Sequence, residues 1–469
     1  MSRIGLVVHG QPPELVGGTE RLVAELAAAL AARGETVEIF SGSIEWRPAF
    51  EVVRDASGPV PVVRVHRHDL FFERWDKLHD PFVERALRRW LDEFRPDVVH
   101  VHHWARLTTT VVATCKAAGV PVVLTLHDLL ASCPRYHRVK ADLSFCEVPP
   151  SPEACRHCAP RWRFQGDAEI DASVTIFARE LRDEVAAADL LLAPTEGHAA
   201  RVLGWLGLQR PVTVLAPASG TPLRPASRPL GRARASGEQP LRAGVFGHLH
   251  PLKGVEVLLD AQAQLPDPSL VEVHVWGEAP VAAMGEALRA RAGDRRVVWH
   301  GRYRPEDLSG APIDVAVLPT LCAESYSFAL DEAAALGVPI LATDLGALAD
   351  RATPRVLLFP RQDAAALAAL LGRLRDDGEL RGRLAAAPAP ARLDMGAHLA
   401  TLLPLYHGLA ARRPRAAPVP LDERALVQRE HAFQLREAAL HELLRSEGWE
   451  DVIARLQGEN DELRRRAGG

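Results

Sequence analysis

The sequence predicts an α/β protein made of two Rossmann-like domains that face a cleft, followed by a C-terminal helical tail. The chain has 469 residues, which is too many for one hydrophobic core. Short apolar runs typical of buried strands alternate with helical patterns, in the order expected of parallel sheets. A segment rich in proline, arginine, serine and glycine separates two such series and is typical of a linker.

The domain limits follow from these patterns. We expect the first domain over residues 1–217, with a cysteine-containing insertion at about 129–165. The linker spans 218–240 and the second domain 241–410, whose last helix crosses back to the first domain. The remaining residues, 411–469, form a basic linker and an amphipathic helical tail.

Composition limits the classes of function. The net charge of −4 gives no sign of a nucleic-acid partner. The sequence shows neither a signal peptide nor an apolar run of 18 or more residues. We therefore expect a cytoplasmic protein, with peripheral contact to the inner face of the membrane only through a surface patch or a lipid-linked acceptor.

The first domain begins with a strand–loop–helix–strand unit. Ile4–Val8 and Thr36–Phe40 suit buried strands, and a helix is expected over about 19–33. The unit lacks G-x-G-x-x-G, which disfavours a nicotinamide cofactor. Gly17 and Gly18 instead precede the helix and let backbone amides approach a ligand closely, although an ordinary loop–helix junction would also accept them.

A histidine follows one of the next strands. Asp97–His102 and Val120–Leu126 are typical of buried strands, and the second runs into His127. Open parallel sheets bind ligands at the carboxyl ends of their strands. An imidazole there can hydrogen-bond a hydroxyl or a phosphate oxygen, but with 19 histidines in the chain a core or capping role for His127 is the alternative.

Four of the six cysteines fall within 26 residues, and two of them form a C-x2-C pair. Cys133, Cys146, Cys155 and Cys158 could close a tetrahedral structural zinc site that stabilises a proline-rich loop. The alternative is four reduced cysteines in a surface insertion.

The second domain opens with a strand, Leu241–Phe246, and a loop that contains GHLHPLKG before the next helix. In this loop Gly247 permits a close approach of a ligand, and Lys253 supplies a compact positive charge. A solvated surface lysine is the alternative interpretation of Lys253.

A later strand–loop–helix–strand unit, residues 313–342, contains two glutamates. Glu324 lies in the loop after the strand, and the helix from about Ser327 offers unpaired N–H groups that suit an anion such as a phosphate. Glu332, over two helical turns further, is placed to accept paired hydrogen bonds from a ribose diol. Two solvated helix glutamates would give the same pattern.

Taken together, these segments resemble the retaining glycosyltransferases of the GT-B fold, and more narrowly glycosyltransferase family 4. The resemblance covers about residues 1–410. It rests on the paired glycines, on PDVVHVH followed by GVPVVLTLHD, on G-x5-K-G, and on E-x7-E followed by an alanine-rich helix and G-x-P. Their order along the chain is more specific than any one of them.

The resemblance implies a function for each site residue. Glu324 would face the donor sugar, His127 would contact it from the first domain, and Lys253 would bind the donor diphosphate; these three are the expected catalytic residues. The expected substrate-binding residues are Gly17, Gly18, Gly247, His248, Ser325, Tyr326, Ser327, Phe328 and Glu332, the last holding the ribose.

The chain departs from the family pattern at three places. His248 stands where an arginine is common, which weakens the expected phosphate contact. Ser327 stands where a glycine is frequent and could narrow the approach to the donor. The first domain ends in Pro217-Ala218, where many members have P-N-G.

The expected activity is transfer of a hexose-type sugar from a nucleoside-diphosphate sugar to an acceptor hydroxyl, with retention of configuration, in the synthesis of a polysaccharide, a lipid-linked glycan or another cell-surface glycan. The acceptor is expected in the first domain, where the insertion would shape its site. No D-x-D motif occurs, so no cofactor is expected for catalysis. A nucleotide-sugar epimerase on the same fold and a non-catalytic module that acts through its tail are the alternatives.

The tail contains heptad spacing. Leu426, Phe433 and Leu440 are seven residues apart, and a second such series begins at Trp449. This spacing is compatible with a coiled-coil homodimer contact, and equally with packing on the protein's own surface.

Overall fold

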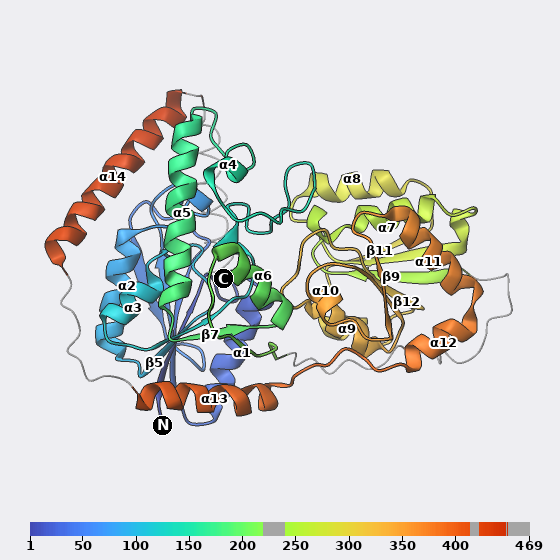
Figure 1. Ribbon diagram of the computed structural model, residues 1–469, viewed down its shortest axis with the longest axis horizontal. Coiled ribbons are helices and arrows are strands. Elements are labelled where there is room, and N and C mark those ends of the chain that lie inside the picture. Colours follow the sequence, from blue (N-terminus) through green and yellow to red (C-terminus); the bar gives the residue numbers. More distant parts are fainter. Residues whose placement is uncertain (219–239, 413–421, 447, 449–469) are drawn as a thin grey trace.

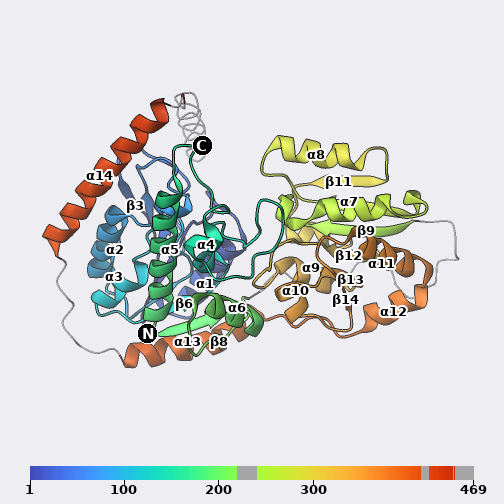
Figure 2. The ribbon, with the colours of Figure 1, turned by 45° about the horizontal axis from the view of Figure 1, so that its top comes forward.

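The computed structural model of the chain contains two sheets, one in each half of the sequence (Figure 1). It describes residues 1–218, 240–412, 422–446 and 448. Helices surround both sheets, and the two sheet-and-helix bodies lie side by side in both views (Figures 1 and 2). The predicted fold class is confirmed: two α/β domains of the Rossmann type, with a helix near the C-terminus.

The first sheet has eight strands in the order β3-β4-β2-β1-β5-β6-β7-β8. Its strands are β1 (Arg3–Val8), β2 (Thr36–Gly42), β3 (Glu51–Asp55), β4 (Val62–His66), β5 (Val98–Val101), β6 (Val122–Thr125), β7 (Leu190–Ala193) and β8 (Thr213–Val214). Its α-helices are α1 (Gly18–Ala32), α2 (Pro81–Phe94), α3 (Val111–Ala117), α4 (Pro152–Cys155), α5 (Asp167–Ala187) and α6 (Glu196–Leu206). Neighbouring strands pair in parallel, except β3, which pairs antiparallel with β4 at the edge.

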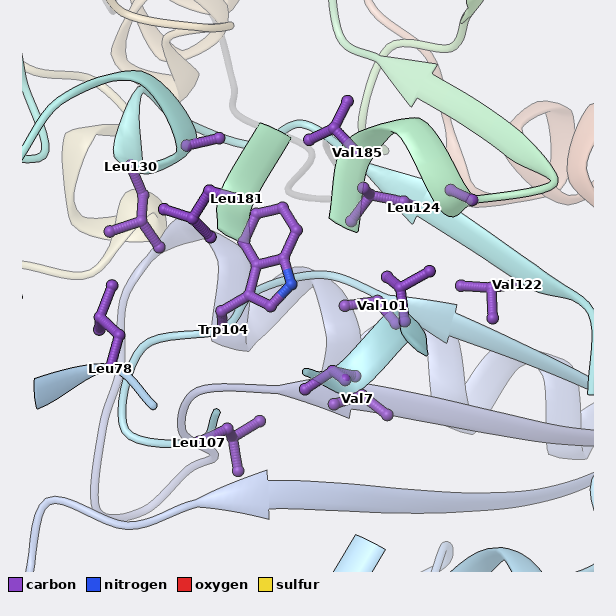
Figure 3. Packing of buried hydrophobic residues seen from close by; sticks show 14 of the residues in the cluster. Val7, Leu78, Val101, Trp104, Leu107, Val122, Leu124, Leu130, Leu181 and Val185 are labelled. Carbon is purple, nitrogen blue, oxygen red and sulfur yellow. The ribbon is translucent and has the colours of Figure 1, made fainter. Parts of the chain in front are cut away.

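The core of the first domain shows why its central strands are continuous apolar runs. Helices cover both faces of a parallel sheet, so every side chain of β5 and β6 is buried. Figure 3 shows Val101 and Leu124 of these strands in one core with Leu181 of α5, and the indole of Trp104 lies beside Leu181. The indole N–H of Trp104 donates to Glu184 at 3.0 Å.

The second sheet has six parallel strands in the order β11-β10-β9-β12-β13-β14. They are β9 (Leu241–Phe246), β10 (Val271–Trp276), β11 (Val297–Gly301), β12 (Val315–Leu318), β13 (Ile340–Thr343) and β14 (Val356–Phe359). The helices of this domain are α7 (Val255–Ala263), α8 (Ala282–Ala292), α9 (Phe328–Leu336), α10 (Ala347–Asp350), α11 (Ala364–Asp376) and α12 (Gly378–Ala386).

The next helix, α13 (Met395–Ala411), crosses back to the first domain, as the sequence predicted (Figure 1). Leu399, Leu402 and Tyr406 are buried in one cluster with residues of β1 and α1. The linker expected between the domains lies outside the described residues from 219 to 239, as does the basic segment 413–421. No helix in the described parts of the chain is both long and apolar enough to cross a membrane.

The described part of the tail, α14 (Glu423–Ser446), packs on the first domain beside α2 (Figure 1). Leu426, Phe433 and Leu444 of α14 are buried, and the ring of Phe433 lies 5.9 Å from that of Phe82. Glu437 accepts a hydrogen bond from the buried ammonium of Lys77 at 2.6 Å. This face of the tail therefore covers the protein's own surface; the second heptad series, from Trp449, lies outside the described residues, and a homodimer contact there stays a prediction.

This packing makes a testable prediction. Replacing Phe433 with alanine should weaken the docking of α14 by about 3 kcal/mol, because a buried aromatic ring is lost. Hydrogen exchange of the α14 amides should then be about 100-fold faster. The matched change Leu435→Ala on the same helix should have little effect, because that side chain is 59% exposed. Equal exchange rates in the two variants would contradict the packing of α14 described here.

Candidate active site

A cavity of about 1140 Å³ lies between the two domains, at the carboxyl ends of β6, β9 and β12 and beside the loop that joins β1 to α1. Parallel sheets place ligand sites at this edge. The structure brings together here every residue that the sequence predicted for the donor site: Gly17, Gly18, His127, Gly247, His248, Lys253, Glu324, Ser325, Tyr326, Ser327, Phe328 and Glu332.

The paired glycines allow the first domain to approach the second closely. A Cβ atom added to Gly18 would lie 2.9 Å from the ring of Phe328, across the cleft. A Cβ added to Gly17 would lie 2.4 Å from the carboxylate of Glu20. Side chains at these positions would therefore force the two domains apart or displace Glu20. With glycine at both positions, the backbone N–H groups at the start of α1 lie close to the cavity.

Lys253 and Glu324 form an ion pair within the cavity, with 2.6 Å between the ammonium nitrogen and a carboxylate oxygen. Two backbone segments hold the pair in place, because the N–H of Leu321 and the hydroxyl of Thr320 both bond to the carbonyl of Leu252. Burial lowers the pKa of Lys253, but the charge and hydrogen bond of Glu324, together with the nearby Cys322 and Glu332, outweigh this effect and leave that pKa raised. Burial likewise raises the pKa of Glu324, and Lys253 brings it below its ordinary value. Both groups are therefore charged at neutral pH.

Ser327 has a left-handed backbone, with φ at 68° and ψ at 91°, directly before α9. Such angles cost a residue with a side chain free energy, which explains why a glycine would be favoured here. The hydroxyl groups of Ser327 and Thr320, together with Lys253, help to lower the pKa of Glu324. Ser327 thus favours the charged form of Glu324, the residue that the sequence predicted to face the donor sugar.

Glu332 lies on the cavity wall about one turn into α9. The phenol of Tyr303 donates a hydrogen bond to it at 3.1 Å. Burial raises the pKa of Glu332 to about 7, because this effect exceeds those of Tyr303 and of the nearby Arg21. The guanidinium of Arg21 also lies 5.8 Å from the ring centre of Phe328. Tyr303 and Arg21 therefore line the cavity in addition to the residues predicted from the sequence.

His127 is half-buried, and its Nε2 lies 2.8 Å from Nδ1 of His102. The hydroxyl of Ser325 donates to its carbonyl oxygen from the second domain. Burial lowers the pKa of His127 to about 3, so the imidazole is neutral. The neighbouring His100 bonds to Tyr406 and Thr125 inside the core.

The structure adds a further polar group, the carboxylate of Asp128, that the sequence did not identify. Asp128 lines the cavity, and its carboxylate accepts a hydrogen bond from Nε2 of His103 at 2.8 Å. The ring of His103 packs on that of His9, with 4.0 Å between centres, and His9 bonds to Glu20. Asp128 follows His127 directly, but its partner His103 comes from the loop after β5, so the sequence offered no sign of the pair.

The cysteine-containing insertion spans the space between the domains (Figures 1 and 2). Its Tyr136 and His137 line the cavity, and the carbonyl of Leu143 accepts a hydrogen bond from Arg361 of the second domain at 2.5 Å. The sulfur of Cys133 accepts the N–H of Arg135 at 3.4 Å, and Arg138 lies 3.8 Å from the sulfur of Cys146.

The positions of the four cysteines do not by themselves define a metal site. Among the described residues, three or more potential metal-binding side chains come within 4.8 Å of one another only at Glu14, Glu45 and His66. Both carboxylates of that cluster pair with arginines. Structural zinc at Cys133, Cys146, Cys155 and Cys158 stays a prediction.

Comparison with known proteins gives consistent matches over both domains. The profile of Glycosyltransferase Family 4 matches residues 16–218, and the profile of Glycosyl transferases group 1 matches residues 240–377. A D-inositol 3-phosphate glycosyltransferase of Xylanimonas cellulosilytica is 30% identical over 454 residues, covering 87% of this chain and 97% of that protein. The enzyme of the same name from an Arthrobacter strain is 29% identical and covers 82% and 89% of the two chains.

Solved structures show the same architecture. Sucrose-phosphate synthase from Thermosynechococcus elongatus superposes with a TM-score of 0.64 at 20% identity, over 88% of this chain and all of that one. HepE of Anabaena, solved with UDP and glucose, gives a TM-score of 0.58 at 16% identity, over 87% of this chain and 100% of that one. At these identities the likeness concerns the fold.

Proposed function

Because the chain belongs to glycosyltransferase family 4, with the GT-B fold, we propose that it transfers a sugar from a nucleoside-diphosphate sugar to an acceptor hydroxyl with retention of configuration. The observation that carries this proposal is the ion pair of Lys253 and Glu324 in an interdomain cavity that Gly18 and Glu332 also line. The product belongs to a polysaccharide, a lipid-linked glycan or another cell-surface glycan.

The positions of the cavity residues suit the following orientation of such a donor. Glu332 accepts the two ribose hydroxyls, and the diphosphate lies between Gly17-Gly18 and the start of α9, within reach of Lys253. The N–H groups at the two helix starts and the ammonium favour an anion there. The sugar then lies between Glu324 and His127, where a carboxylate and a neutral imidazole can both bind hydroxyls.

The chemistry that these residues support is positioning and stabilisation of the leaving group. As the bond between the anomeric carbon and the phosphate oxygen breaks, negative charge grows on the diphosphate, and Lys253 stabilises it. Glu324 is held by Lys253 in its charged form, in which it accepts hydrogen bonds from hydroxyl groups of the donor sugar. The leaving diphosphate takes the proton of the acceptor hydroxyl on the same face of the sugar, which retains configuration.

A donor screen tests the proposal. Thermal unfolding is measured with UDP-, GDP- and ADP-sugars and with free nucleotides, in the native chain and in Glu332→Ala. A ligand present at a hundred times its dissociation constant stabilises by about 2.7 kcal/mol, which gives a visible shift. A shift with one donor that is lost in the variant supports the proposed site. The absence of a shift with every donor would contradict it.

The raised pKa of Glu332 predicts how donor binding depends on pH. Ribose hydroxyls bind the carboxylate better than the carboxylic acid, and Glu332 has a pKa of about 7 in the free protein. Protonation therefore competes with the donor below pH 7, and affinity should rise about tenfold between about pH 6 and pH 8. Titration calorimetry with an intact nucleotide sugar measures this, because its phosphates do not titrate in that range. Glu332→Gln should bind more weakly and without the rise; a rise that persists in Glu332→Gln would assign it to another group.

A further inference from the structure

We infer that the acceptor is an uncharged polyol, a sugar or cyclitol whose hydroxyls face the first-domain wall of the cleft and which carries no phosphate there. The inference rests on the proposed transferase function and deepens it by naming the class of acceptor. It is carried by the side chains of this wall: Asp128, His127, Tyr136 and His137.

Asp128 places a fixed carboxylate on this wall. Nδ1 of His103 accepts the N–H of Ala105 at 3.0 Å, so its Nε2 carries the ring proton and donates it to Asp128. The other carboxylate oxygen accepts the N–H of Leu130 at 2.9 Å. Desolvation raises the pKa of Asp128, but His103 and this N–H have the larger combined effect and leave that pKa well below its ordinary value. The side chain is 45% exposed, so a charged acceptor would meet this anion directly.

The neighbouring groups on the wall are neutral. Burial lowers the pKa of His127 to about 3 and, together with the nearby Arg135, that of His137 to about 4. The hydroxyl of Tyr136 donates its proton to the carbonyl of Glu73 at 2.7 Å, which leaves its oxygen lone pairs for a ligand. Such a wall accepts hydrogen bonds from hydroxyl groups and offers a phosphate no charge to pair with.

Positive charge in the cleft lies on the donor side. Among the described first-domain residues that line the cleft, Arg21 is the only arginine or lysine, and it faces Phe328 and Glu332 of the second domain. Across the cleft, Lys253 is paired with Glu324, and the other two arginines of the cavity, Arg289 and Arg302, lie on α8 and in the loop after β11. A phosphate on the acceptor would therefore lie near Asp128 without a compensating cation, and like charges placed together oppose binding. The relatives described above are named for a phosphorylated cyclitol, so this inference separates the present chain from them.

The test compares matched neutral and phosphorylated acceptors. With the nucleotide sugar that gives a shift in the donor screen, release of nucleoside diphosphate is measured with glucose and glucose 6-phosphate, fructose and fructose 6-phosphate, and myo-inositol and D-inositol 3-phosphate. In at least one pair the neutral member should give a kcat/KM about tenfold or more above that of its phosphate. Preference for the phosphorylated member in the pairs that respond, or no response to any neutral polyol, would overturn the inference.

Variants of Asp128 test whether its charge sets the preference. Asp128→Asn and Asp128→Ala should each lower kcat/KM for the neutral acceptor and narrow its advantage over the phosphate about tenfold. Asp142→Asn is the matched control, because it removes a carboxylate from an exposed part of the insertion, outside the cleft. If Asp128 only maintained the fold, its variants would lower both members of a pair equally, and that outcome would overturn the assignment. A donor shift combined with a phosphate preference would contradict the acceptor inference alone, whereas loss of every donor shift would contradict the transferase site.

Discussion

Replacing Lys253 with alanine is expected to lower kcat/KM for sugar transfer about a thousandfold. The ammonium lies 2.6 Å from the carboxylate of Glu324 and faces the place where the donor diphosphate is proposed to bind. Its removal takes away the charge that stabilises the departing diphosphate. It also leaves Glu324 as an unpaired anion beside that diphosphate, which repels it. Both effects grow as the bond breaks, so most of the loss should appear in kcat.

The chain offers a matched control for this variant. Lys116 also forms an ion pair, with 2.5 Å to Asp189, and its side chain is 40% exposed compared with 39% for Lys253. It lies on α3, away from the cavity. Lys116→Ala should change the rate less than about twofold, because Lys116 lies away from the cavity and the loss of its exposed ion pair has little effect on stability. Steady-state release of nucleoside diphosphate measures both variants, and a Lys253→Ala enzyme that keeps a tenth of the native rate would contradict the role given to this residue.

The sequence predicted the fold and the family because both depend on local patterns in a fixed order. Each apolar run that became a central strand is short and ends near a glycine, a proline or a polar residue. Because the strands are parallel, their carboxyl ends share one edge in each sheet, and these edges of the two domains face one cavity, which residues as distant as Gly18 and Glu332 line. The family assignment is confirmed by the matches over both domains.

Pairings between distant residues could not be predicted in this way. The partner of Asp128 is His103, which belongs to the loop after the preceding strand, and that of Glu332 is Tyr303, from the loop after β11. Each pairing depends on how two loops fold back on each other, which no spacing within one segment encodes. The edge strand β3 was not predicted for a different reason: its side chains are largely exposed, so it lacks the apolar run of a buried strand.

The tail shows the limit of heptad spacing. Leu426 and Phe433 do form an apolar face, but the partner of this face is α2 of the same chain. A pattern of apolar residues shows that a helix is covered on one side and does not identify what covers it. The charges of Glu430 and Glu437 on α14, which pair with Arg85 and Lys77, select this surface.

Gly254, the residue after Lys253, is expected not to tolerate a side chain. Its φ is 67°, and a Cβ atom added there would lie 1.9 Å from the carbonyl oxygen of Pro319. That carbonyl belongs to the backbone at the end of β12 and cannot rotate away, so the loop of Lys253 would have to move. Gly254→Ala should therefore destabilise the second domain by about 4 kcal/mol or more and separate Lys253 from Glu324.

Gly337 separates the effect of the close contact from that of the backbone angle. Its φ is 74°, similar to that of Gly254, but nothing lies within 4 Å of an added Cβ. Gly337→Ala should cost only the strain of a left-handed alanine, about 1 kcal/mol. Urea unfolding, followed by tryptophan fluorescence to which Trp276 and Trp299 of the second domain contribute, measures both variants. Equal midpoints would mean that the backbone angle alone sets the cost, whereas a much lower midpoint for Gly254→Ala would show that the contact with Pro319 fixes the loop that carries Lys253.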